Sequence, residues 1–253
     1  MTPPLLFVDD LSGVTVGMVV ALPADEARHA AAALRMTTGE SVFVADGKGR
    51  KAAGDAQVQG NHVGIVVTSV EDIAQPNPRI TVVQALAKGE HGELAVDLMT
   101  QAGVDRIIPW SASRSIVQWK EDRANKSRNK WLTMARSAAK QSRRAWIPEI
   151  SEVTSTKELV ACIPSFDATF ILHEDAVHLL ASAKLPVSGE ICLIVGPEGG
   201  ISQEEISEFM GAGAVTAALG SSVLRASLAG AIGLGVLSTR LRWADAAKPN
   251  VEG

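Results

Sequence analysis

A strand, a glycine-rich loop and a helix start follow one another within residues 191–205, and this segment most restricts what the chain can fold into. The run Ile191–Val195 is apolar with a β-branched bias, which predicts a short buried strand. The sequence Gly-Pro-Glu-Gly-Gly follows at 196–200, and Ser202 with Glu205 has the spacing of a helix capping box. Because adjacent glycines admit a ligand close to the backbone, the loop predicts a binding site. An ordinary strand-to-helix turn could have the same pattern.

The loop at 196–200 differs from the common nucleotide-binding loops. No Gly-Lys-Ser/Thr follows it, so it is not a P-loop, and it lacks the Gly-x-Gly-x-x-Gly spacing of a dinucleotide site. These absences argue against a nucleotide-dependent oxidoreductase on a doubly wound sheet.

Composition indicates a globular protein with one large or two modest domains. The 253 residues are 46% hydrophobic and 21% charged. No apolar run approaches the roughly 20 residues needed to span a membrane, and residues 1–4 do not resemble a signal peptide. We therefore expect no membrane association and a cytoplasmic location. Cys162 and Cys192 lie in apolar surroundings, which predicts buried thiols, and no metal site is expected.

Basic residues are concentrated in one part of an otherwise acidic chain. Between Arg106 and Arg144 there are eleven Lys or Arg and two acids, which gives +9 in a chain whose net charge is −4. A solvated basic face is one interpretation. Confinement of the charge to one segment favours a polyanionic partner.

The pattern of apolar residues changes near residue 73. Residues 1–72 predict a β-rich module with one helix near Ala24–Met36, and the proline-containing stretch 73–78 predicts a linker. Strands and helices alternate over 79–245, and 246–253 is expected as a tail. The β-rich stretches are Val14–Leu22, Ser41–Ala45, Ala52–Val58 and His62–Val70. The later strands are expected at Ile80–Ala87, Arg106–Trp110, Ala168–Leu172, Ile191–Val195 and Val215–Leu219.

A long helix is expected over Asp122–Arg143, with apolar residues on one face. On its opposite face four basic residues fall within an arc of about 100° at 3.6 residues per turn. These residues, which we call the basic stripe, are Arg136, Lys140, Arg143 and Arg144. The basic stripe, with Arg114 nearby in sequence, is expected to contact the phosphates of a polyanionic partner.

The last three predicted strands each run into a loop of small or polar residues. In a parallel sheet, the carboxyl ends of adjacent strands form the ligand crevice, so these three loops are expected to enclose one small molecule. The last helix, Ser227–Arg242, carries several glycines. Glycine costs roughly 1 kcal/mol inside a helix, so their repetition predicts close approach of another backbone.

The chain resembles the RsmE family over nearly its whole length. The glycine-rich loop and the Leu219–Arg225 stretch are the most specific parts of this resemblance, and both have the family's spacing. The motifs that carry it are His29, Leu34-Arg35, Gly39-Glu40, Gln101–Val104, Ile107–Pro109, Ser113–Ser115, Lys130-Trp131, Ala138–Arg143, His173-Glu174, Val195–Ser202 and Leu219–Arg225. Two positions depart from the family. Ala226-Ser227-Leu228-Ala229 stands where Thr-Glu-Thr-Ala is usual, and Lys140 stands where Glu is common.

The resemblance implies a SPOUT-class methyltransferase that modifies N3 of one uridine in 16S ribosomal RNA, acting on the RNA or on the small ribosomal subunit. The implied fold is α/β, with an N-terminal PUA-like β-barrel that binds RNA and a C-terminal SPOUT domain with a deep trefoil knot. The resemblance also implies a homodimer, and we expect the last helix near the two-fold axis. A non-catalytic RNA-binding assembly factor is the alternative function.

The resemblance also assigns roles to residues of the strand-end loops. S-adenosylmethionine is expected at Leu172, Gly196, Glu198, Gly199, Gly200, Leu219, Gly220 and Leu224. Arg225 suits stabilisation of the uridine anion, because a fixed positive charge can stabilise developing negative charge. A salt bridge from Arg225 to Glu198 is the structural alternative. The general base is left unassigned, because His173 at a strand end is more often a hydrogen-bonded structural residue.

Overall fold

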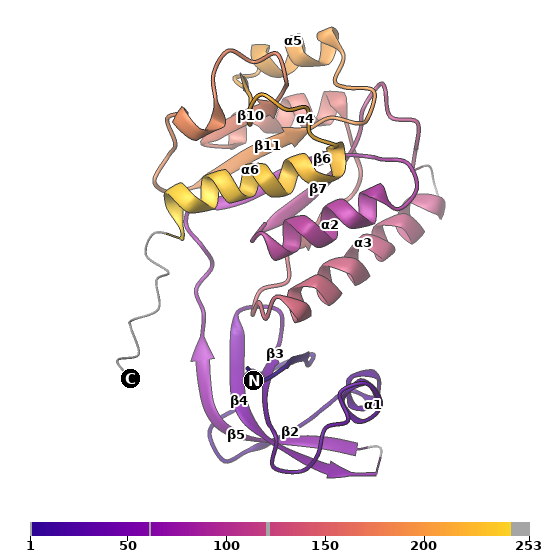
Figure 1. Cartoon of the computed structure of the whole chain (residues 1–253), viewed down its shortest axis with the longest axis vertical. Helices are drawn as coiled ribbons and strands as arrows, with labels where there is room; N and C mark the ends of the chain where they lie inside the picture. Colours follow the sequence, from indigo (N-terminus) through magenta and orange to yellow (C-terminus); the bar gives the residue numbers. More distant parts are fainter. Residues whose placement is uncertain (1, 61, 120–121, 244–253) are drawn as a thin grey trace. The chain divides into compact units, whose positions relative to one another are not determined.

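The computed structural model describes residues 2–60, 62–119 and 122–243, and the chain forms two compact units (Figure 1). The first unit comprises Met1–Gln75 and Arg136–Ile147, and the second comprises Pro76–Ala135 and Pro148–Gly253. This division differs from the expected boundaries, because residues 136–147 belong to the first unit rather than to the segment 79–245. The expected tail, 246–253, lies outside the described residues.

The long helix α3 (Asp122–Gln141) contributes to both units. Its residue Ala139 is fully buried in a cluster with Leu5, Phe7 and Ala45 of the first unit. Within the second unit, Trp131 of α3 lies beside Gly92. Apolar residues from the middle and from the end of one helix therefore pack in different units, which a periodic pattern along the sequence does not reveal.

The first unit contains a five-stranded sheet with the strand order β1-β3-β4-β5-β2. Among the strand pairs described in it, β1–β3 is parallel, and β3–β4, β4–β5 and β2–β5 are antiparallel. The expected strand Val14–Leu22 is reduced to β2 because the chain turns before it, with Gly17 at φ 89°. Strand β1 was not expected. The elements are β1 (Leu5–Phe7), β2 (Val19–Ala21), α1 (Ala24–Ala32), β3 (Ser41–Ala45), β4 (Arg50–Gln59) and β5 (His62–Asp72).

The second unit is built on a parallel sheet with the order β12-β10-β11-β6-β7-β8, and β9 also pairs with β7. Its strands are β6 (Arg79–Ala85), β7 (Arg106–Ser111), β8 (Glu149–Ile150), β9 (Thr154–Ser155), β10 (Ala168–Leu172), β11 (Glu190–Val195) and β12 (Val215–Ala217). Its other helices are α2 (His91–Gln101), α4 (Thr156–Cys162), α5 (Gln203–Gly211) and α6 (Ala226–Leu241), with 3₁₀ turns at Ile163–Ser165 and Leu180–Ser182. Within the part of the chain that the structure describes, no helix is long and apolar enough to cross a membrane.

Alternate residues of the central strands face different helices of the second unit. Val83 and Ile194 belong to the cluster that includes Phe209 of α5 and residues of α4. Val82 and Leu193 instead lie under glycines of α6. Figure 1 shows α2 and α6 covering one face of the sheet and α4 and α5 the other. Side chains of successive strand residues point to opposite faces, which explains why these strands are apolar throughout.

Two of the three glycines of α6 are packed against side chains, which corrects the expectation of a neighbouring backbone. A Cβ atom on Gly230 would lie 2.6 Å from the Met99 sulfur, and one on Gly233 would lie 2.9 Å from Leu193 Cδ1. At Gly235 a Cβ atom would meet nothing within 4 Å. Two of the glycines therefore let α6 pack closely on α2 and the sheet.

The two cysteines differ in exposure, so the expectation of two buried thiols was wrong for Cys162. Cys162 is exposed at the end of α4, whereas Cys192 is fully buried in β11. In α4 and the turn after it, Leu159 and Ile163 face the core, whereas Cys162, the last residue of α4, is exposed. Burial raises the pKa of the Cys192 thiol far above its usual range.

Candidate functional site

A cavity of about 710 Å³ lies at the carboxyl ends of β10 and β11, next to the start of α6. Its walls come from five segments: the loop after β10, the glycine-rich loop after β11, the residues that lead into α6, the first residue of α2 and the start of the β7–α3 connection. They include Leu172–Asp175, Val195–Ile201, Gln203, Val223–Ser227, Ala229, His91 and Arg114. The position agrees with the general rule that parallel sheets bind ligands at the carboxyl ends of their strands.

The expectation that three strand-end loops meet is confirmed, because β12, β10 and β11 are neighbours in the sheet. Six of the residues expected to bind a cofactor line the large cavity: Leu172, Gly196, Glu198, Gly199, Gly200 and Leu224. The other two, Leu219 and Gly220, line a smaller cavity of about 60 Å³ that shares Leu172 and Leu224 with the larger one. The structure thus brings all eight residues to one region.

The glycine-rich loop has open backbone at Gly199. A Cβ atom there would meet only Arg114, at 3.5 Å from Arg114 Cβ, which is an ordinary contact. Gly200 needs its glycine for another reason, since its φ of 72° is strained for other residues. At Gly196 a Cβ atom would lie 2.6 Å from Ile201 Cγ1. Of these three glycines, Gly199 is therefore the one whose missing side chain keeps the cavity open. At Gly200 the backbone conformation requires glycine, and at Gly196 the packing against Ile201 does.

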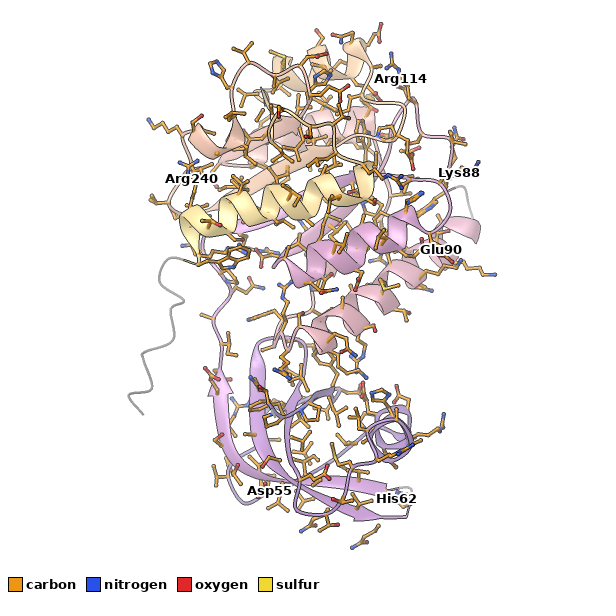
Figure 2. The ribbon with its side chains drawn as sticks, in the orientation of Figure 1. Asp55, His62, Lys88, Glu90, Arg114 and Arg240 are labelled. Atoms are coloured by element: carbon orange, nitrogen blue, oxygen red, sulfur yellow. The ribbon has the colours of Figure 1, made fainter. Side chains whose placement is uncertain are left out.

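Glu198 connects this loop to the segment after β6. Its Oε1 atom accepts a hydrogen bond from the backbone N–H of Lys88 at 3.2 Å. Figure 2 shows Lys88 and Glu90 near the start of α2. Glu198 therefore makes a contact between two loops.

The capping box predicted at Ser202 and Glu205 is present at the start of α5. Glu205 does more than cap, because Ser113 donates to it through both its backbone N–H and its hydroxyl, each at 2.8 Å. The Thr156 hydroxyl donates to the same carboxylate at 2.9 Å. Burial alone would raise the pKa of Glu205, but the hydrogen bonds from Ser113, Ser202 and Thr156 outweigh it, so this pKa lies below its ordinary value.

Two arginines of the second unit reach the cavity. Arg225 is the N-cap residue of α6, its side chain is exposed, and it lines the cavity. Within the described residues no ion pair to Glu198 or to another carboxylate engages Arg225. Arg114 donates from Nη1 to the Gly199 carbonyl at 3.2 Å. Arg114 therefore belongs with the glycine-rich loop and not with the basic stripe, whose residues lie in the first unit.

Two histidines line the cavity, and only one of them was considered from the sequence. The Nδ1 atom of His173 accepts a hydrogen bond from the Asp175 backbone N–H at 3.2 Å, which supports its structural interpretation. His91, the first residue of α2, was not expected in the site. The sequence did show that a strand ends shortly before His91, near Ala85. The strand order was needed to show that this strand, β6, lies beside β11 and so brings His91 to the cavity.

The basic stripe is partly engaged within the first unit. Lys140 forms a salt bridge at 3.0 Å with Glu26 of α1, whose side chain is 5% exposed. The Arg136 guanidinium lies over the Phe7 ring, 4.9 Å from its centroid. Arg143 is exposed and donates to the Thr2 carbonyl at 3.2 Å, and Arg144 is half-buried. The charge of Lys140 is thus neutralised internally, which argues against its expected contact with RNA.

Comparisons with known proteins agree on one family. Residues 75–238 match the family model described as RNA methyltransferase domain. A ribosomal RNA small subunit methyltransferase E from Mycobacterium bovis is 38% identical over 100% of this chain and 97% of its own length.

Two solved structures share the fold along the chain. One is a ribosomal RNA small subunit methyltransferase E from Neisseria gonorrhoeae bound to S-adenosylmethionine, with a TM-score of 0.85 and 26% identity over 95% of this chain and 98% of that one. The other is a methyltransferase from Legionella pneumophila in complex with the same cofactor, with a TM-score of 0.82 and 27% identity over 95% and 98%. The chain belongs to the ribosomal RNA small subunit methyltransferase E family.

Proposed function

We propose that this protein transfers a methyl group from S-adenosylmethionine to N3 of a uridine in 16S ribosomal RNA. The observation that carries the proposal is the cavity of about 710 Å³, whose walls join a glycine-rich loop with open backbone to the exposed Arg225. Membership of the family supports ribosomal RNA as the substrate, and the two cofactor-bound structures support S-adenosylmethionine as the donor.

The residues of the two adjoining cavities suit this cofactor. Leu172, Leu219 and Leu224 supply apolar surface for an adenine ring. Gly199 and Gly220 have no side chain between backbone and cavity, and a Cβ atom on Gly220 would meet nothing within 4 Å. When bound, S-adenosylmethionine supplies an electrophilic methyl group on a sulfonium. The glycines and leucines of these loops would hold and orient the cofactor, and Glu198 keeps its loop against the β6–α2 connection.

Arg225 is proposed as the catalytic residue that stabilises negative charge on the uridine ring. Methylation at N3 requires loss of the imide proton, and the charge then spreads to the two ring carbonyl oxygens. A guanidinium is always ionised and offers several donors in a planar fork, so it can hold such oxygens as charge develops. Its exposure at the cavity wall supports this role. We assign no base, because His173 already accepts a hydrogen bond at Nδ1.

Arg114 and Arg143 are the residues that we propose for contact with RNA phosphates. Both side chains are exposed, and each donates a hydrogen bond to a backbone carbonyl. Arg136 and Arg144 add positive charge to the same part of the first unit as Arg143. The engagement of Lys140 with Glu26 makes it the weakest member of the basic stripe for this purpose.

The finer features of the family fold are also proposals. We propose that the first unit is a PUA-like barrel that binds RNA, and its five-stranded sheet supports this. We propose a trefoil knot around the cofactor loops and a homodimer in which α6 lies near the two-fold axis. Exposed apolar side chains on and before α6, namely Val223, Leu228 and Ile232, support the dimer. A protein that methylates ribosomal RNA would act in the cytoplasm.

Methyl transfer can be tested with the purified protein, S-adenosylmethionine and 16S ribosomal RNA or small subunits. Mass spectrometry of the digested RNA should show 3-methyluridine at one position. A methyl group on ribose or on another base would contradict the reaction. Cofactor and RNA binding without any methyl transfer would instead favour the non-catalytic assembly factor.

The cofactor site has its own test in Gly199→Val. The valine side chain would enter the open space at this loop, so S-adenosylmethionine affinity measured by calorimetry should fall about tenfold or more, or at least 1.4 kcal/mol. The control is Gly211→Val at the end of α5, which lies outside the cavity and where a Cβ atom would meet nothing within 4 Å. Undiminished affinity in a folded Gly199→Val variant would remove this loop from the site.

A further inference from the structure

We propose that Glu205 is a positioning residue that holds Arg114 at the cavity by fixing the backbone of Ser113. The proposal rests on the proposed function, because it assigns to Glu205 an effect on RNA methylation through Arg114. It goes beyond helix capping, which is the only role that the sequence pattern of Ser202 and Glu205 predicts.

The carboxylate of Glu205 collects donors from three separate segments. Ser113 donates through its backbone N–H to Oε1 and through its hydroxyl to Oε2, both at 2.8 Å. Thr156, at the start of α4, donates to Oε1 at 2.9 Å, and the Ser202 backbone N–H donates to Oε2 at 3.2 Å. The residue is 4% exposed. A buried carboxylate with four hydrogen bonds therefore joins the connection after β7, the start of α4 and the start of α5.

The chain contains a second capping box that shows what capping alone requires. Glu158 at the start of α4 accepts from the backbone N–H and the hydroxyl of Ser155, at 2.8 and 2.7 Å. Both residues are exposed. The capping box of Ser155 and Glu158 is thus formed by residues of one helix start. The bonds from Ser113 and Thr156 to Glu205 are not needed for capping and therefore have another role.

The residue that follows Ser113 is Arg114, one of the two arginines that line the cavity. Arg114 Nη1 donates to the Gly199 carbonyl at 3.2 Å, and Arg114 packs along the open side of Gly199. Glu205 lies just beyond the glycine-rich loop in sequence. The same carboxylate therefore fixes both the backbone before Arg114 and the start of the helix that follows the glycine-rich loop. The distance between the Arg114 guanidinium and this loop is fixed as a result.

The consequence for activity follows from the sensitivity of group transfer to geometry. A displacement of about 1 Å at a positioning group can cost on the order of a hundredfold in rate. In Glu205→Gln, one oxygen is replaced by an NH₂ group that cannot accept from the N–H and O–H donors around it. The Ser113 segment should then lose its fixed position, while the substitution leaves the side chain of Arg114 itself unchanged.

The first measurement is amide hydrogen exchange of the ligand-free protein. The Ser113 amide donates to Glu205, so its exchange should become at least about tenfold faster in Glu205→Gln. The matched control is Glu158→Gln, which weakens a capping box of the same type and should leave the Ser113 amide unchanged. An equally protected Ser113 amide in both variants would overturn the proposal.

The second measurement is a double-mutant cycle on kcat/KM for RNA methylation. Glu205→Gln and Arg114→Ala should each lower kcat/KM about tenfold or more, and the double variant should be no worse than Arg114→Ala alone. Glu158→Gln should stay within about twofold of wild type. Multiplicative losses in the double variant would show that Glu205 does not act through Arg114, and full activity of Glu205→Gln would exclude the positioning role.

A milder variant covers the case in which Glu205→Gln does not fold. Ser113→Ala removes only the hydroxyl bond to Glu205, so a smaller loss of kcat/KM is expected, again absent in the Arg114→Ala background. If wild-type protein makes no methylated RNA, the proposed function fails. If wild type is active and these variants match it, only the positioning role fails.

Discussion

Cationic side chains gather in two regions of this protein, and the two regions use their charge differently. At the cavity of the second unit, Arg225 is exposed, and Arg114, also exposed, donates to a backbone carbonyl. In the first unit, Lys140 is held by the buried carboxylate of Glu26, and Arg136 covers the Phe7 ring. A count of basic residues therefore overestimates the charge available to RNA in the first unit. The difference between engaged and available cations can be tested by substitution.

Loss of Lys140 should have the largest effect on stability. Lys140→Ala leaves the Glu26 carboxylate buried without its cation, so the free energy of unfolding should fall by about 3–5 kcal/mol. Urea unfolding measures this. The double variant Glu26→Leu with Lys140→Met should recover most of the loss, because both charges are then absent. A loss below 1 kcal/mol for Lys140→Ala would mean that Lys140 is available after all.

Loss of Arg225 should have the largest effect on catalysis. Arg225→Ala should lower turnover roughly a hundredfold or more, the effect typical of removing one charge-stabilising donor. Arg225→Lys should recover only part, because an ammonium lacks the planar fork of donors.

The control for Arg225 lies on the same helix. Arg240 in α6 donates to the backbone carbonyls of Leu180 and Ala183, so Arg240→Ala should keep normal turnover (Figure 2). Near-normal turnover of Arg225→Ala in a steady-state assay would place Arg225 with the engaged cations instead.

Arg143 should contribute to RNA binding by a smaller amount. If it contacts one phosphate, Arg143→Glu should weaken binding several-fold and reduce the slope of log K against log salt by about 0.7–0.9. Lys157→Glu in α4 makes the same change in net charge at another exposed position and should leave the slope unchanged. An unaltered slope in Arg143→Glu would identify the basic stripe as a solvated face.

Acid should affect the cavity region through Glu205, and this is the smallest expected effect. Its pKa in the folded protein lies below the ordinary 4.5, so the carboxylate stabilises the fold above that pH and loses this contribution as pH falls through the folded value. The melting temperature of wild type should therefore decline more steeply below about pH 4.5 than that of Glu205→Gln. Parallel declines would show that the Glu205 bonds contribute little.

Local patterns predicted much of the second unit. Runs such as 168–172 and 191–195 are apolar because both faces of a parallel sheet are covered, and they appear in the structure as β10 and within β11. The capping box at Ser202 was equally visible, because all of its atoms come from four consecutive residues. The cavity residues that follow these strands were predictable for the same reason.

Long-range pairing could not be predicted in this way. Lys140 and Glu26 are 114 positions apart, so the periodicity of α3 showed a charged face but not its buried partner. Strand order is equally absent from a single sequence, and His91 entered the site only because β6 lies beside β11. Strand β1 has three residues, too few for an alternating pattern to be recognised.

Because the two cysteines differ in exposure, the number of thiols that react with a reagent can be used to measure unfolding of the second unit. A thiol reagent added to the native state should modify Cys162 alone, because Cys192 is buried and its raised pKa keeps the reactive thiolate scarce. The second equivalent of reagent reacts only when β11 separates from its neighbours. A dye on Cys162 would meanwhile sit at the end of α4, the helix whose first residue, Thr156, donates to Glu205.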